Sequence, residues 1–293
     1  NLFVSYMNGQ QQQKRRRLFV FGCSFSSGLW ATVADFAAVN FDQTYSFAGP
    51  AQSNPYNVSR FMELIHSGRI DLESGQDHVV FQTTGWGRFG YWSGGAQGHW
   101  QMLGDLFGAR GQRPHPYPRE AFDPRQAVYT NWASLAAVAA VRQALTRPEH
   151  LTVIGGMDFI ELWDPELSLD LGPEDLGPVL ELERQLGLDS RPSIWQHCLD
   201  LRGGDPSTMW KLQFQDGHED AHPYIDECWQ YVEQYLPDWA TPRAREFRDR
   251  CHQEFGWQSA DQQGQQYQRL RREYRIERIH TTDHLWMDLT QLR

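Results

Sequence analysis

Several residue types and patterns are scarce in this chain of 293 residues, and each scarcity argues against a class of protein. Its four cysteines, at positions 23, 198, 228 and 251, have no short paired spacing, which argues against a disulfide framework or a four-cysteine zinc site. No apolar run approaches the roughly 20 residues that span a bilayer, and no signal peptide is visible. We therefore expect no membrane partner and, although the sequence begins at Asn1 rather than at Met, a cytoplasmic location by default.

Basic charge is also in short supply. The 27 Lys and Arg residues face 37 Asp and Glu residues, which gives a formal net charge of −10. An acidic protein repels phosphate backbones, so we expect no nucleic-acid partner. Hydrophobic residues make up 40% of the chain and aromatic residues 13%, which is enough apolar material for a folded core.

The pattern of apolar residues predicts an α/β fold. Short apolar runs that stop at glycine or threonine alternate with longer segments in which apolar residues recur at helical spacing. Such alternation indicates βαβ units around a mostly parallel sheet, and therefore a three-layer α/β/α architecture. The expected strands lie at 18–21, 78–82 and 151–154, and the expected helices at 28–39, 57–70 and 131–146, with another after Pro223.

Composition divides the chain into three parts. Residues 1–17 are a polar leader, residues 18–240 carry the α/β pattern, and residues 241–293 are expected to form a helical C-terminal extension. Two stretches rich in Gly and Pro, 93–126 and 164–192, are expected to be loop insertions in the main domain.

The first segment that could carry catalytic residues runs from Gly22 to Gly28, between an expected strand and an expected helix. A serine just beyond a strand end, here Ser24, can expose its hydroxyl above the sheet, while the N–H groups of the next helical turn point towards negative charge. The same pattern also fits a plain strand-to-helix turn in which serine caps the helix.

The second segment runs from Asp216 to Pro223, directly before an expected helix. It supplies an imidazole base together with carboxylates that can orient it. His222 is followed by Pro223 and the helix, whereas His218 with Asp216 forms an alternative base pair without that context.

Together these segments resemble the SGNH (GDSL-like) hydrolase superfamily. The first motif of that family, Gly-x-Ser-x-x-x-Gly, matches Gly22, Ser24 and Gly28, and its last motif, Asp-x-x-His-Pro, is nearly matched by residues 220–223. Between them, Phe47-Ala48-Gly49 followed by Gln52-Ser53-Asn54 is similar to the family's second motif. The resemblance spans residues 18–236 and implies a flavodoxin-like arrangement of strands.

The resemblance also implies roles for particular residues. Ser24 would be the nucleophile and His222 the general base, oriented by Asp220 or by its rival Glu219, which stands at the usual three-residue spacing. The N–H groups of Ser24 and Gly49 would form the oxyanion hole, helped by Asn54. No cofactor or metal is required.

The third family motif departs from the usual pattern. Gly87 stands where an asparagine oxyanion donor is expected, in the run Gln82-Thr83-Thr84-Gly85-x-x-Arg88, which is similar to a subgroup of SGNH-like proteins. Arg88 would hold an anionic substrate group or form a structural ion pair. Trp86 belongs to an aromatic-rich stretch, with Tyr91, Trp92 and Trp100, that could stack on sugar rings or simply pack.

These observations favour a serine esterase, deacylase or O-acyltransferase that acts on a small-molecule or glycan acyl ester through an acyl-Ser24 intermediate. One alternative is a catalytically impaired relative that binds carbohydrate or a partner. Another is a zinc hydrolase using His218-Glu219-x-x-His222, although that pattern needs a helix, and Gly217 and Pro223 flank it.

Overall fold

The computed structural model describes residues 15–26, 30–50, 52–85, 88–93, 99–105, 124–157, 173–204, 212–213, 219–220, 222–255, 260–279 and 292. A five-stranded sheet of parallel strands lies at the centre, in the order β6-β3-β1-β2-β9. The strands are β1 (Arg17–Phe21), β2 (Gln43–Ser46), β3 (Asp77–Thr83), β6 (Leu151–Gly155) and β9 (Ile276–Arg278).

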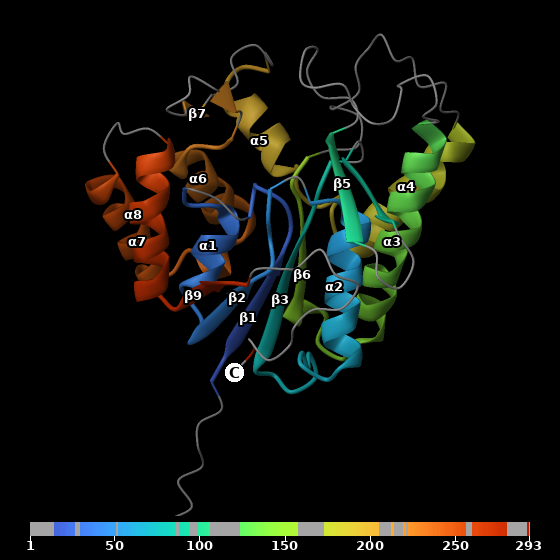
Figure 1. Cartoon of the computed structure of the whole chain (residues 1–293), viewed down its shortest axis with the longest axis horizontal. Helices are drawn as coiled ribbons and strands as arrows, with labels where there is room; N and C mark the ends of the chain where they lie inside the picture. The colour runs from blue at the N-terminus through green and yellow to red at the C-terminus, as the bar shows by residue number, and fades with distance from the viewer. Residues whose placement is uncertain are drawn as a thin grey trace, which may run out of the picture.

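Helices cover both faces of this sheet, so the predicted three-layer α/β/α fold is confirmed (Figure 1). One layer contains α1 (Val33–Ala38), α5 (Ile194–Leu201), α6 (Ile225–Tyr235), α7 (Pro242–Glu254) and α8 (Ala260–Glu273). The opposite layer contains α2 (Asn54–His66), α3 (Pro124–Ala144) and α4 (Pro173–Leu186). Within the described ranges, none of the helices has the length and apolarity needed to cross a membrane.

Strand β1 shows why the two layers form. Leu18 and Val20 point into the cluster under α1 and α6, whereas Phe19 and Phe21 point into the cluster under α2 and α3. Side chains alternate between faces along a strand, so a run of apolar residues without polar interruption is the sequence of a strand buried on both sides. Phe21 stacks on Phe47 with ring centroids 5.1 Å apart.

The predicted elements around β1, β3, β6 and α1 to α3 are present, with boundaries shifted by a few residues, but two predicted loops were wrong in part. Within 93–126 the chain forms β5 (His99–Asp105), which pairs antiparallel with β4 (Arg88–Ser93), and α3 already begins at Pro124. Within 164–192 lies α4. Further short elements are the 3-10 turns η3 (Pro148–His150) and η5 (Pro237–Trp239) and the strand pair β7 (Leu212–Gln213) and β8 (Glu219–Asp220).

The C-terminal region is part of the same core rather than a separate extension. β9 adds to the edge of the sheet by parallel pairing with β2. α8 buries Tyr267 and Leu270 in the cluster shared with α1 and α6. The expected C-terminal helices are present as α7 and α8, but they pack in the layer that contains α1, and β9 extends the central sheet, so residue 240 is not a boundary between two cores.

The order of the strands determines where a ligand site is expected. From β1 the chain first moves outward to β2 and then returns to the other side of β1 to form β3. Ligands of open parallel sheets bind at such a switch point, outside the carboxyl ends of the strands. The first four strands of this sheet follow the flavodoxin-like order, whereas its fifth strand, β9, lies beside β2 rather than beyond β6.

Candidate active site

Ser24 lies at the switch point, in the turn that follows β1. The turn is closed by a hydrogen bond from the Ser26 N–H to the Cys23 carbonyl (3.0 Å), and the Ser24 residue is only 6% exposed. Cys23 is buried in the core. Ser27 and Gly28, which complete the motif, lie outside the described residues.

His222 comes from the C-terminal half of the chain and packs against this turn. It lies two residues before the N-cap of α6, and it is 4% exposed. Its ring is 5.4 Å from that of Phe25, the residue next to Ser24, and 4.2 Å from that of Trp30, measured between centroids. The fold thus brings the two predicted catalytic segments together, although within the described part of the chain no hydrogen bond joins Ser24 to His222.

The two candidate acids occupy strand β8, which ends two residues before His222. Glu219 pairs with Gln213 and Asp220 with Leu212 in an antiparallel ladder. The backbone of these two residues is described, whereas His218 and Asp216 lie outside the described residues. A strand at 219–220 is incompatible with the helix that a His-Glu-x-x-His zinc site requires.

The side-chain amide of Asn54 is fully occupied by hydrogen bonds to other parts of the fold. Its amide donates to the Thr84 carbonyl (3.1 Å) and to Asn131 Oδ1 (2.8 Å), and its Oδ1 accepts from the Thr84 N–H (2.8 Å). Both amide hydrogens are used, so Asn54 can stabilise an oxyanion only if one of these bonds breaks. The structure therefore favours a clamping role, which joins α2 and α3 to the end of β3, over the predicted role as an oxyanion donor.

Two other hydrogen-bond donors near the strand ends, the backbone N–H of Gly49 and the hydroxyl of Thr84, are held less tightly than the Asn54 amide. The Gly49 N–H donates to the Gly22 carbonyl over 3.3 Å, at the long end of the hydrogen-bond range. The hydroxyl of Thr84, directly after β3, is buried and has no hydrogen-bond partner among the described residues. An unsatisfied buried hydroxyl is uncommon and marks Thr84 as a candidate donor that the sequence pattern did not single out.

Gln82 is a further residue whose importance the sequence alone did not show. It is fully buried near the end of β3, and its Oε1 accepts the hydroxyl hydrogen of Ser26 (2.6 Å). Its Nε2 donates to the Thr83 carbonyl (3.0 Å) and contacts Cys23 Sγ at 3.3 Å. The sequence marks Gln82 only as the start of the polar run, with its Gln-x-x-Gly-x-x-Arg pattern, that ends an otherwise apolar strand.

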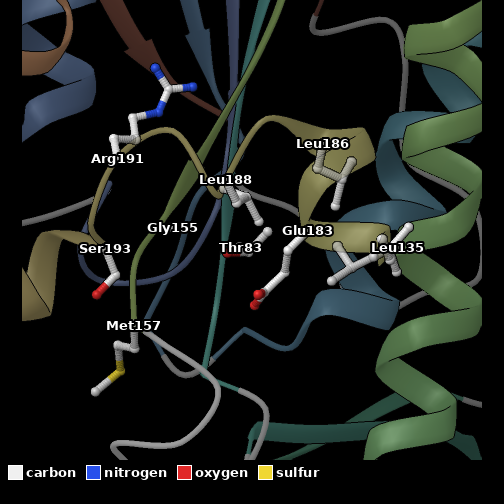
Figure 2. Close-up of a pocket in the computed structure, with 10 residues that line it drawn as sticks. Thr83, Leu135, Gly155, Met157, Glu183, Leu186, Leu188, Arg191 and Ser193 are labelled. Carbon is white, nitrogen blue, oxygen red and sulfur yellow. The ribbon is translucent and has the colours of Figure 1, made fainter. Parts of the chain in front are cut away.

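A small cavity of about 40 Å³ lies at the carboxyl ends of β3 and β6 (Figure 2). Thr83 and Gly155 form its floor, and Leu135, Leu186 and Glu183 come from α3 and α4. Neither Ser24 nor His222 lines this cavity. It is much smaller than the several hundred Å³ typical of ligand pockets, so it is not by itself a substrate site.

The predicted substrate-binding residues are less well described. Arg88 begins β4, but its side chain is outside the described part of the structure, as are Trp86 and Gly87 entirely. Among the residues that are described, no three His, Cys, Asp or Glu side chains converge as metal ligands would.

The fold and the turn after β1 define a class, an α/β/α protein with a serine at the switch point of a parallel sheet. Comparisons with protein-family models, with curated proteins and with solved structures found no match for this chain.

Proposed function

We propose that the chain is a serine-dependent acyl hydrolase or acyltransferase that forms an acyl-Ser24 intermediate. The observation that carries this proposal is the placement of His222. A histidine from the C-terminal half packs on Phe25, which lies in the turn of Ser24, and on Trp30, which follows that turn in the chain. A nucleophile and a base brought together from distant parts of the chain are the minimum for covalent acyl transfer.

In the proposed reaction, His222 accepts the hydroxyl proton of Ser24 as the oxygen attacks the ester carbonyl carbon. The C=O π electrons move to the carbonyl oxygen, and the Ser24 and Gly49 N–H groups stabilise the resulting oxyanion; the Gly49 N–H must release the Gly22 carbonyl to do so. Collapse expels the alcohol, which takes the proton from His222. In the second half of the reaction, water or an acceptor hydroxyl gives a proton to His222 and attacks the acyl-Ser24 carbonyl. Ser24 then leaves, takes the proton back from His222 and is free of the acyl group.

The proposed substrates are acyl esters, with glycan esters favoured. The β4–β5 hairpin carries Tyr91, Trp92 and Trp100, and it places Trp92 directly opposite Trp100 in the ladder. Aromatic side chains are suited to stacking on sugar rings, which supports a glycan acyl ester over a lipid.

The test is covalent labelling with a small fluorophosphonate, read by intact mass and peptide mapping. We expect wild type to gain one label at Ser24, whereas Ser24→Ala and His222→Asn gain none under the same conditions. His66→Asn is the matched control, because His66 is an exposed histidine at the end of α2, and this variant should label like wild type. A folded wild-type protein that takes no label, or that labels at another serine, would overturn the proposal.

A second candidate is a binding protein that has lost catalysis. Two observations favour it. Both amide hydrogens of Asn54 are used in hydrogen bonds within the fold, and Gly87 stands where SGNH-like hydrolases, which the sequence resembles, carry an asparagine donor. Losing one such donor typically lowers the rate by about 10²–10³. In this case Ser24→Ala would bind an acylated glycan as tightly as wild type, and neither protein would release its acyl group.

A further inference from the structure

We propose that Gln82 is the positioning residue of the nucleophile: its side-chain amide holds the turn of Ser24 from both sides. This role rests on the proposed function. The amide reaches Cys23 through Nε2 and Ser26 through Oε1, and these two residues flank Ser24 and Phe25 in the turn. The nucleophile is thus held between two contacts made by a single planar group.

The glycines around Gln82 show that the fold is built to accommodate it. A Cβ on Gly22 would lie 2.8 Å from Gln82 Oε1, and a Cβ on Gly156 would lie 2.0 Å from Gln82 Nε2. Real Cβ atoms do not approach this closely, so each glycine leaves space that the Gln82 side chain fills. The amide is consequently packed between the loops that follow β1 and β6.

Further hydrogen bonds make this arrangement stiff. The Gly156 N–H donates to the Thr83 carbonyl (3.0 Å), and this carbonyl also accepts from Gln82 Nε2. The Trp195 N–H, at the start of α5, donates to the Gly156 carbonyl (3.1 Å). The loops after β1 and β6 therefore meet at one buried amide at the end of β3, whose every donor hydrogen is used.

Stiffness of this kind matters for a nucleophile. A displacement of about 1 Å in a reacting group can lower a rate about 100-fold, and catalytic groups keep their geometry through partners packed behind them. Gln82 does not need to touch a substrate to act in this way. It acts through Ser26 and Cys23 on the orientation of the Ser24 hydroxyl and N–H.

The experiment compares fluorophosphonate labelling rates at Ser24 with thermal stability. Gln82→Met keeps the length of the side chain but removes the amide. Asn40→Leu is the matched control, because the Asn40 amide also accepts a hydroxyl hydrogen, from Thr241, and donates to two carbonyls, those of Phe36 and Trp239. Asn40 lies between α1 and β2, at the amino ends of the strands, whereas the turn of Ser24 lies at their carboxyl ends. We expect both variants to lose similar thermal stability, but only Gln82→Met to label about 10–100-fold more slowly.

A second pair of variants covers the case in which Gln82→Met does not fold. Ser26→Ala removes only the hydroxyl that donates to Gln82 Oε1. Gly156→Ala leaves the Gln82 side chain itself unchanged but displaces its amide and the Thr83 carbonyl, which would lie 2.6 Å from the new Cβ. Gly177→Ala is the control for the latter, because a Cβ on Gly177 meets nothing within 4 Å. We expect Ser26→Ala and Gly156→Ala to slow labelling and Gly177→Ala to leave it unchanged.

A double-variant cycle completes the test. If Gln82 acts through Ser26, combining Ser26→Ala with Gln82→Met should slow labelling no further than Gln82→Met alone. Wild-type labelling rates in folded Gln82→Met, or in both Ser26→Ala and Gly156→Ala, would overturn this role and leave the proposed function intact. A wild-type protein that takes no label would overturn the proposed function and this role with it.

Discussion

At the scale of single residues, Glu219 and Asp220 are the two carboxylates that could orient His222 in the proposed reaction. Glu219 and Asp220 are neighbours in β8, and the chain reaches His222 within two or three residues of either. The acid of a catalytic triad holds the imidazole in the tautomer that can accept the nucleophile's proton, and its amide variant loses up to about 10⁴-fold in rate.

We expect one of Glu219→Gln and Asp220→Asn to lower the Ser24 labelling rate by about 10²–10⁴-fold, and the other to change it less than threefold. The measurement is the second-order labelling rate at a pH above 7, where an unoriented imidazole is neutral in either variant. Equal rates in both variants and in wild type would show that neither carboxylate belongs to the site.

Thr84 is the second residue to which the structure gives a testable role. Its buried hydroxyl has no partner among the described residues, and the residue immediately follows the carboxyl end of β3. We expect Thr84→Val, which keeps the shape of the side chain, to lower turnover of an activated acyl ester about 10²-fold while leaving KM nearly unchanged. Thr83→Val is the neighbouring control. Unchanged turnover in Thr84→Val would show that the oxyanion is held by backbone N–H groups alone.

At the scale of elements, a buried ion pair joins the first helix to the last. Asp35 in α1 and Arg271 in α8 are each 1% exposed, with Arg271 Nε 3.1 Å from Asp35 Oδ1. The other oxygen of Asp35 accepts from the hydroxyls of Thr32 (2.8 Å) and Tyr267 (2.6 Å). Burial, together with the Asp35 carboxylate, raises the pKa of Tyr267 well above its usual value, so this phenol stays protonated and donates.

Breaking this pair should be costly because it leaves a charge uncompensated in the core. We expect Arg271→Met to lower the free energy of unfolding by about 3–5 kcal/mol, measured by urea denaturation. Adding Asp35→Asn should recover part of that loss, since the remaining group is then neutral. A loss below about 1 kcal/mol in Arg271→Met would show that α8 is not held by this pair.

At the scale of the whole molecule, His78 makes stability depend on pH. Its ring lies 4.3 Å from that of His150 and 5.0 Å from that of Phe41, near the amino ends of the strands. Burial, followed by the charges of His150 and Arg16 and opposed by Asp77 and Glu149, lowers the pKa of His78 from 6.5 to about 4. Between these two values the unfolded chain binds a proton that the folded chain does not.

Stability should therefore be complete above pH 6.5 and decline as the pH falls towards 4. Because the His78 ring is only partly buried, solvent screens these charges, and we expect a loss of about 1 kcal/mol, or about 2–4 °C in Tm, between pH 7 and 5. His78→Phe keeps the ring packing and should show a smaller decline. An identical decline in this variant would assign the pH dependence to other groups.

The sequence by itself determined the α/β class, the strands β1, β3 and β6, and the two segments that carry Ser24 and His222. These features are local, because a strand buried on both faces must be apolar throughout and a turn at its end must tolerate close packing. The sequence did not reveal β9 as a strand of the sheet, the clamp made by Asn54, or the contacts of Gln82. Only the tertiary structure decided these, because each depends on which distant groups meet. Buried polar residues such as Asn54 and Gln82 look alike in sequence until their hydrogen-bond partners are in place.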